Sequence, residues 1–219
     1  MDEPLIPWAR VASFVRQHTH DVRNHLNSLD LEASLLSELV TTDEAKATVE
    51  RVRRQIRNFA NEMRALSSKF SEPVQGKALV PASMMFLIWQ DQADSLDPKP
   101  QVEWSQDVGE AKITVDPDAI ARVFRELLTN ATQFSRGKPL TAAATRTDGQ
   151  VDFTLREPKE ESLDPSAWGE VPLTSTRRGG YGLGLWNLSR SVEASHGTVN
   201  RTFDSGKRQL VTTLSFPAQ

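Results

Sequence analysis

Three polar residues near the N-terminus have the types and the spacing that phosphoryl chemistry needs. His20 and Asp21 are adjacent in the segment HDVRNHL, and Asn24 follows four residues after the histidine. On a helix, this spacing puts the imidazole and the amide one turn apart on the same exposed face. An imidazole nitrogen can attack phosphorus, a neighbouring carboxylate can orient the ring or take up its proton, and an amide can position a water. The spacing alone also fits a surface helix whose polar residues have no chemical role.

The two other histidines of this segment have different positions. His18 and His25 flank the apolar seam of the same helix, beside Val22, which predicts packing or rim positions for both. The steps between His18, His20 and His25 do not place three nitrogens on one face, so we expect no metal site there. The sequence contains no cysteine, which excludes disulfides, thiol catalysis and cysteine-ligated zinc.

Two long helices are expected to position these residues. Apolar residues recur at alternating steps of three and four over 12–40 and again over 49–70. Thr42 or Asp43 can cap the second helix. An antiparallel hairpin with one apolar seam on each helix cannot cover both seams by itself, whereas two hairpins in a four-helix bundle can. We therefore expect a homodimer.

A linker and then a mixed α/β pattern follow the two helices. The segment SEPVQGK, with Pro73 and Gly76, is typical of a linker. Asp116 is a capping residue in front of Pro117, which predicts the start of a helix. We expect helices over about 82–94, 117–134 and 184–195, and strands near 102–104, 112–115, 140–146, 151–157 and in a final hairpin. The fold class is therefore α+β.

The composition limits the partners and the location of the chain. A net charge of −3 over 219 residues provides no basic field for nucleic acid or for an anionic membrane. The N-terminus MDEPLIPWAR is acidic and interrupted by proline, unlike a signal peptide. The longest apolar run, Met84 to Trp89, is far shorter than the roughly 20 residues of a membrane helix. We expect a cytoplasmic protein with no membrane and no nucleic acid as partner.

The segment HDVRNHL resembles the phosphoacceptor box of sensor histidine kinases. In that box, an acidic residue follows the histidine, and an Asn or Thr and then a Leu come after two variable residues. Carried over by position, the resemblance implies that His20 is the phosphoacceptor, Asp21 its acid/base partner and Asn24 the residue that positions water for phosphatase activity. It also implies two-component signalling, with a response-regulator receiver domain as the partner.

The segment ELLTNATQF resembles the N box of the ATP-binding domain of the same family, which has the Bergerat fold. The resemblance implies that Asn130 holds the Mg²⁺ that bridges the phosphates and that Glu126 is a polar partner one turn earlier. Without the resemblance, the segment is an amphipathic helix that serves the core. Gln133 stands where the family frequently has a lysine.

The segment GGYGLGLWNL resembles the second glycine box of that domain. Gly180, Gly182 and Gly184 would let the backbone close around phosphates in front of a helix. The preceding stretch VPLTSTRRGG resembles the lid of the site. Arg177 and Arg178 in this stretch either reach a nucleotide phosphate or are solvated loop charges.

These boxes occur in the family's order and cover nearly the whole chain. They imply a dimerisation and phosphoacceptor hairpin over residues 1–72 and an α/β sandwich of the histidine-kinase ATPase type over 77–219, with ATP and Mg²⁺ as ligands.

One stretch departs from the family. Where the family has Asp-x-Gly-x-Gly for adenine, this chain reads EPKEE from Glu157 to Glu161. A carboxylate is present, but charged residues replace both glycines, which opposes a close approach of nucleotide.

Three functions fit these observations. A histidine phosphotransferase of a phosphorelay would pass a phosphoryl group through His20 to or from a response-regulator aspartate, and the EPKEE segment favours it. An ATP-dependent sensor histidine kinase core would phosphorylate its own His20, and the glycine box favours it. A non-enzymatic scaffold would use the fold only to bind a partner, and the complete HDVRN face opposes it. On balance we favour a transferase of the first kind.

Overall fold

The computed structural model describes residues 7–70, 76–135, 137–173 and 182–219 of the chain. The chain divides into two compact units, Met1–Glu72 and Pro73–Gln219, which we call the hairpin unit and the α/β unit. No helix within the described ranges is both long and apolar enough to cross a membrane.

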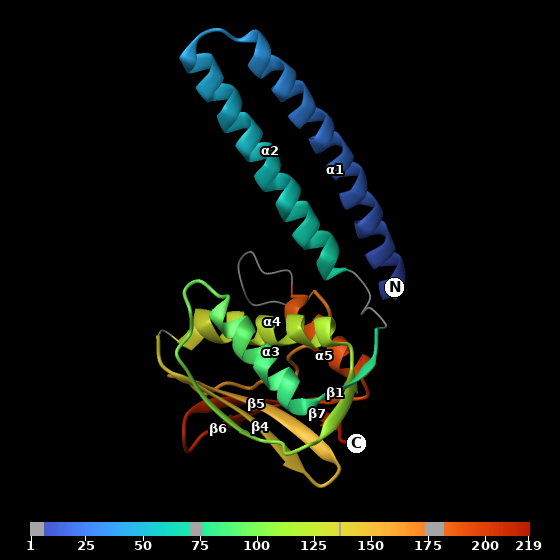
Figure 1. The fold of residues 1–219 in the computed structure, drawn as a ribbon, viewed down its shortest axis with the longest axis vertical. Coiled ribbons are helices and arrows are strands. Elements are labelled where there is room, and N and C mark those ends of the chain that lie inside the picture. Colours follow the sequence, from blue (N-terminus) through green and yellow to red (C-terminus); the bar gives the residue numbers. More distant parts are fainter. Residues whose placement is uncertain (1–6, 71–75, 136, 174–181) are drawn as a thin grey trace, which may run out of the picture. The chain divides into compact units, whose positions relative to one another are not determined.

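The hairpin unit consists of two antiparallel helices, α1 (Trp8–Leu39) and α2 (Asp43–Lys69) (Figure 1). The first turn of α2 is capped by Thr42, whose hydroxyl accepts a hydrogen bond from the backbone N–H of Ala45 at 3.3 Å. This bond satisfies one of the donors that a helix start leaves free. The buried residues of α1 are spaced seven apart and are Ala12, Thr19, Leu26 and Ala33.

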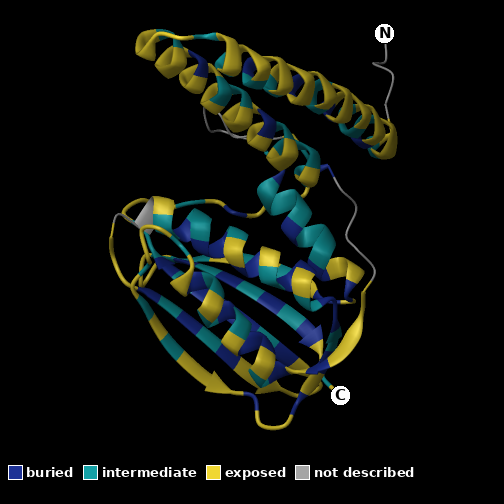
Figure 2. Ribbon diagram, turned by 45° about the horizontal axis from the view of Figure 1, so that its top comes forward, coloured by how far each residue is buried: buried dark blue, intermediate teal, exposed yellow. Residues whose placement is uncertain are grey.

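Part of the predicted apolar seam remains in contact with solvent (Figure 2). Leu29 and Leu36 of α1 are about half exposed, as are Val52 and Phe59 of α2. Two helices bury only the residues that face each other directly, so the flanking positions of each seam stay uncovered within one hairpin.

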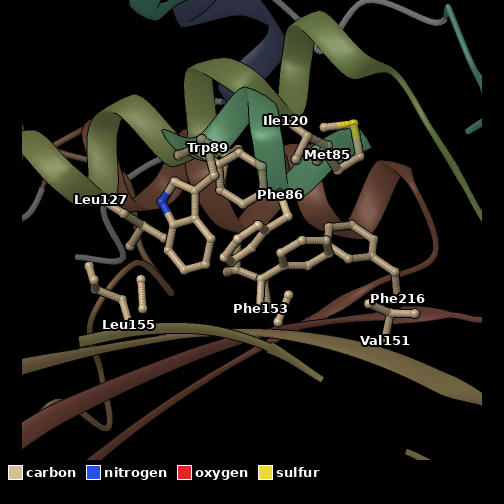
Figure 3. Close-up of a cluster of buried hydrophobic side chains, with 14 of the residues drawn as sticks. Met85, Phe86, Trp89, Ile120, Leu127, Val151, Phe153, Leu155 and Phe216 are labelled. Atoms are coloured by element: carbon tan, nitrogen blue, oxygen red, sulfur yellow. The ribbon is translucent and has the colours of Figure 1, made fainter. Parts of the chain in front are cut away.

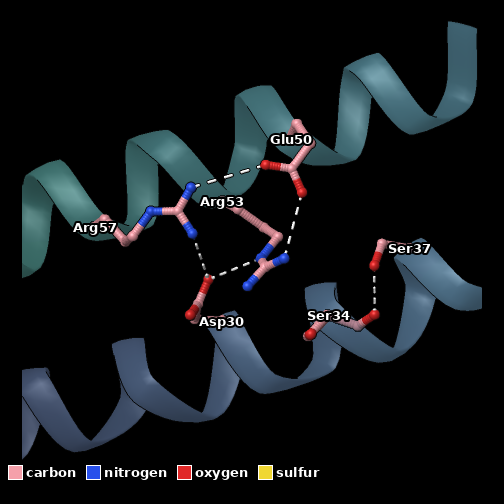
Figure 4. Close-up of polar contacts among 6 residues, drawn as sticks. All are labelled: Asp30, Ser34, Ser37, Glu50, Arg53 and Arg57. Carbon is pink, nitrogen blue, oxygen red and sulfur yellow. Dashed lines mark hydrogen bonds and ion pairs between the residues drawn. The ribbon is translucent and has the colours of Figure 1, made fainter.

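Ion pairs connect the two helices and specify how they align (Figure 4). Asp30 of α1 accepts a hydrogen bond from Nε of Arg53 at 3.2 Å, and Nη1 of Arg57 lies 3.7 Å from the same carboxylate oxygen. Arg53 also donates to Glu50 within α2 at 3.3 Å. The hydrogen bond to Asp30 raises the pKa of Arg53 above its ordinary value. These groups are partly exposed, so they contribute more to the register of the helices than to their stability.

A five-stranded sheet forms the base of the α/β unit, in the order β2-β4-β5-β7-β6. Strands β2 and β4 are parallel, and the other neighbours are antiparallel. The strands of this sheet are β2 (Val102–Asp107), β4 (Leu140–Thr147), β5 (Gln150–Pro158), β6 (Thr198–Asp204) and β7 (Gln209–Pro217). A second sheet pairs β1 (Ala78–Pro81) with β3 (Lys112–Val115). The sequence did not predict β1, which is four residues long and pairs with a strand far along the chain.

Three helices cover one face of the five-stranded sheet (Figure 1). They are α3 (Ala82–Asp94), α4 (Pro117–Ser135) and α5 (Gly184–Ala194). An aromatic core fills the space between the two layers (Figure 3). The rings of Trp89 and Phe124 stack with centroids 4.9 Å apart, and Phe153 lies 5.3 Å from Phe124. Burial of each such side chain stabilises the fold by about 1.5–3 kcal/mol.

The start of α4 follows the prediction from its sequence. The carboxylate of Asp116 is buried and accepts a hydrogen bond from the backbone N–H of Ala119 at 3.0 Å, as a helix cap does. It also accepts from the N–H of Gly76 at 3.4 Å, which ties the chain before β1 to α4. The predicted α+β class, a helical hairpin followed by an α/β sandwich, is confirmed.

Candidate functional site

His20 lies on the solvent-exposed face of α1, because the preceding residue, Thr19, lies on the buried seam. Thr19 is buried on the seam, where its hydroxyl donates to the backbone carbonyl of Val15 at 2.8 Å. The next residue therefore points outward, and the His20 side chain is 54% exposed. Nδ1 of His20 lies 3.3 Å from Oδ1 of Asp21 and 3.4 Å from Nδ2 of Asn24. The structure thus brings the three predicted residues together around one ring nitrogen.

The two contacts of Nδ1 leave the other ring nitrogen of His20 free for chemistry. The carboxylate of Asp21 can only accept, so this contact needs a proton on Nδ1. The amide N–H₂ of Asn24 would need a lone pair there instead. Since a charge-assisted bond is the stronger of the two, the contact with Asp21 favours the tautomer that has the proton on Nδ1 and the lone pair on Nε2. In that tautomer, Nε2 is the ring nitrogen that can act as a nucleophile.

The sequence reasoning missed Gln17, which belongs to the same cluster. Its Nε2 donates to Oδ1 of Asp21 at 2.9 Å, one turn before the carboxylate. The spacing of four residues was the signal that could have identified it. A hydrogen bond from this side restricts the carboxylate rotamer and so helps to hold it beside the imidazole.

The neighbouring histidines do not join the cluster. The ring of His18 lies parallel to that of Phe14, with centroids 6.0 Å apart. His25 is exposed. The described residues contain no group of three His, Cys, Asp or Glu side chains that could hold a metal ion.

In the α/β unit, two of the predicted boxes meet where α4 packs against α5. Nδ2 of Asn130 donates to Oε1 of Glu126 at 3.1 Å along α4. The Glu126 carboxylate rests against the backbone of Gly184 at the start of α5, in the space that a Cβ at this position would occupy. Any larger residue at 184 would push the carboxylate away from Asn130. Gly182 has a φ of +64°, a conformation that favours glycine.

Three predicted residues of this site, Gly180, Arg177 and Arg178, lie outside the described residues. Gln133 of α4 is exposed.

The predicted adenine carboxylate, Glu157, is the next-to-last residue of β5 and lies on the inner face of the sheet. It continues the buried alternation of Val151, Phe153 and Leu155, and it is 5% exposed. Nζ of Lys159 donates to its Oε2 at 2.8 Å. The burial of Glu157 raises its pKa above the ordinary value, and the charge of Lys159 acts in the opposite direction.

These residues do not fit an adenine nucleotide as they stand. The carboxylate that should accept the adenine amino group already accepts from Lys159, and both side chains are almost closed to solvent. Lys159 occupies the place of the first glycine of the family motif, where the backbone must approach the base.

A shallow depression of about 290 Å³ lies at the same end of the sheet. Its lining residues come from three segments that the sequence does not connect, and most of them are basic. They are Lys138, Pro158, Lys159, Glu160, Lys207 and Arg208. Two of these lysines are paired, since Nζ of Lys138 lies 3.6 Å from Oε1 of Glu160 and Nζ of Lys159 lies 2.8 Å from Oε2 of Glu157.

Comparisons by sequence and by structure give different results for this chain. No protein-family model matches the sequence, and no curated protein does either. Solved structures do match. The chain resembles full-length ShkA in complex with AMPPNP, with a TM-score of 0.69 and 19% identity over 94% of this chain and 46% of ShkA. The chain thus spans less than half the length of that protein.

Two other solved chains match over nearly their whole length. The mycobacterial sensor histidine kinase MprB has a TM-score of 0.55 and 13% identity, over 65% of this chain and 97% of that one. The Acinetobacter baumannii histidine kinase AdeS has a TM-score of 0.51 and 14% identity, over 90% of this chain and 97% of that one. Together with the helical hairpin and the α/β sandwich, these similarities show that the chain has the fold of a sensor histidine kinase catalytic core.

Proposed function

We propose that this chain is a histidine phosphotransferase that passes a phosphoryl group through His20 to or from the aspartate of a response-regulator receiver domain. The observation that supports this proposal is the exposed cluster on α1, in which Asp21 and Asn24 surround Nδ1 of His20. An exposed nucleophile on a helix is open to an aspartyl phosphate that another protein carries.

In the transfer, Nε2 of His20 attacks phosphorus while the bond from phosphorus to the aspartate oxygen breaks. The electron pair of that bond leaves with the receiver carboxylate. Nδ1 keeps its proton, so the phosphorylated ring carries a positive charge. The negative charge of Asp21, 3.3 Å away, stabilises that ring. The reverse step returns the phosphoryl group to a carboxylate without any change in proton count.

An ATP-dependent autokinase is the second candidate, with ATP and Mg²⁺ in the α/β unit. Asn130, Glu126 and Gly184 support it because they lie together as the family motifs require. The similarity to a histidine kinase that was solved with AMPPNP also favours it. The ion pair of Glu157 and Lys159 opposes it. A scaffold without enzymatic activity is the third candidate, and the cluster around His20 opposes it.

The chain is proposed to act as a homodimer. The exposed seam residues Leu29, Leu36, Val52 and Phe59 would be covered by the same residues of a second hairpin. Removal of such apolar surface from water contributes about 25 cal/mol per Å².

The proposed role of His20 is tested by phosphoryl labelling. The full chain is incubated with a receiver phosphorylated with ³²P and, separately, with labelled ATP, and phosphohistidine is mapped by mass spectrometry. We expect label on His20 from the receiver, none in His20→Ala, and unchanged label in His18→Ala and His25→Ala. Label that persists in His20→Ala would contradict the assignment. Label that comes from ATP would favour the autokinase.

A further inference from the structure

We infer that the ammonium group of Lys159 takes the place at the Glu157 carboxylate that the amino group of an adenine ring would need. The α/β unit therefore binds no adenine nucleotide. This inference deepens the proposed function because it removes ATP as a donor to His20. It is tested by binding alone, so its failure would leave the transfer between a receiver and His20 intact.

The backbone directs both side chains into the same space. In an extended chain, residues two apart point to the same side, so Lys159 follows Glu157 on the face that Val151, Phe153 and Leu155 present to the helices (Figure 3). The N–H of Lys159 donates to the carbonyl of Arg208 at 2.8 Å. This bond continues the pairing of β5 with β7 by one residue beyond Pro158 and holds the lysine backbone in place.

The contact itself is short and enclosed. Nζ of Lys159 lies 2.8 Å from Oε2 of Glu157, and the two side chains are 10% and 6% exposed. An N–H donor to a carboxylate at the end of this strand is the contact that an adenine amino group would make. Lys159 supplies it with a full positive charge, and its four-carbon chain fills the room that a glycine would leave.

Replacement of the Lys159 contact by a contact with a nucleotide is unfavourable for both Glu157 and Lys159. The carboxylate would give up a charge-assisted hydrogen bond for one from a neutral amine, which is the weaker kind. The lysine would leave a buried pairing, and breaking such a pair leaves an uncompensated charge.

The glycine box has a structural reason to persist without a ligand. The Glu126 carboxylate packs into the space beside Gly184, and Gly182 has a positive φ that suits glycine. Both residues therefore serve the packing of α5 on α4 and the turn before α5. Their presence does not require that a phosphate is bound there.

The experiment is calorimetric titration of the full chain with magnesium and AMPPNP. We expect no saturable binding by the wild-type chain up to about 1 mM, and affinity at least about tenfold stronger in Lys159→Ala, where the carboxylate and the room beside it are released. Lys207→Ala is the matched control, since Lys207 is exposed at the same end of the sheet, and it should behave as the wild type.

Micromolar binding by the wild-type chain would overturn the inference. Equal absence of binding in the wild type and in Lys159→Ala would also overturn it, because the obstacle would then not be Lys159.

A second measurement needs no variant. Brief acetylation of the wild-type chain, followed by mass spectrometry, should modify Lys159 at least about tenfold more slowly than Lys207, because its amine is buried and paired. Equal rates would show that the amine is free.

Discussion

The chemistry proposed for the hairpin depends on a few side chains whose contacts are long in this structure. The distances of 3.3 and 3.4 Å from Nδ1 of His20 exceed those of well-formed hydrogen bonds. Catalytic contacts of this kind often tighten only when the partner binds. We then expect Asp21 to act in the transfer of the phosphoryl group and Asn24 to act in the hydrolysis of the phosphohistidine.

Asn24→Ala should lengthen the lifetime of the phosphohistidine by about tenfold, because the amide no longer positions the attacking water. Uptake of the phosphoryl group from a receiver should be nearly unchanged. The measurement is the decay of label on isolated, phosphorylated protein. Asn27→Ala, which removes an exposed amide elsewhere on α1, is the control. An unchanged lifetime in Asn24→Ala would exclude Asn24 from hydrolysis.

Lys159→Met should make the stability of the α/β unit depend more strongly on pH. Burial already raises the pKa of Glu157 above 4.5, and loss of the lysine charge raises this pKa further. A carboxyl group with a raised folded-state pKa stabilises the fold fully below its unfolded pKa and loses this contribution as pH rises through the folded pKa. We therefore expect little deficit near pH 4 and a deficit of about 3 kcal/mol at pH 7. Denaturant unfolding of both proteins at the two pH values measures it, and an equal deficit at both would contradict the pairing.

A contact between the Glu126 side chain of α4 and the backbone of α5 helps to position these two helices of the α/β unit. Glu126 of α4 fits beside the backbone of Gly184 and accepts from Asn130, so one carboxylate links the two helices. The aromatic core beneath them, with Trp89 and Phe153, holds the helices on the sheet (Figure 3). The boxes therefore stay together through packing.

Gly184→Ala should lower the free energy of unfolding by about 1 kcal/mol, because the added methyl group displaces the Glu126 carboxylate from Asn130. In a Glu126→Ala background, the same substitution should be neutral or stabilising, since alanine favours a helix. Thermal unfolding of the four proteins of this cycle provides the measurement. Additive effects of the two substitutions would show that Gly184 and Glu126 do not interact.

The two units differ in how much apolar surface they bury by themselves. The α/β unit has a continuous core between sheet and helices, whereas the described part of the hairpin unit buries few large side chains and exposes several leucines. Such a hairpin would gain stability in the proposed pairing with a second copy. In the proposed dimer, the helix that carries His20 would be one of the paired helices.

Leu29→Glu together with Leu36→Glu should convert the protein from a dimer to a monomer, because two carboxylates on each hairpin would be buried in the bundle. Light scattering on a size-exclusion column should give twice the chain mass of 24.4 kDa for the wild type and that mass for the variant. Leu31→Glu changes an exposed leucine of α1 that lies off the seam, so this control should remain dimeric. A monomeric wild-type chain would refute the expectation.

Local patterns were sufficient for most of the elements. The alternating steps of three and four predicted α1 and α2, Thr42 and Asp116 predicted the starts of α2 and α4, and the strand expected near 151–157 is β5. Each of these signals involves residues within one or two turns or strand steps, where spacing alone decides which side chains share a face. The meeting of His20, Asp21 and Asn24 is of the same kind.

Long-range packing decided the remaining features. The pairing of β1 with β3 and the contact of Glu126 with Gly184 join segments that are distant in the sequence, so no local period could indicate them. Glu157 and Lys159 are only two residues apart, and their shared side of the chain could be predicted. Their burial could not, because it depends on how the sheet and the segments around it pack, for example on the hydrogen bond from the N–H of Lys159 to the carbonyl of Arg208. The sequence by itself therefore determined the position of the histidine that is proposed to accept the phosphoryl group. Only the tertiary structure decided that the carboxylate of Glu157 is buried and already paired with Lys159.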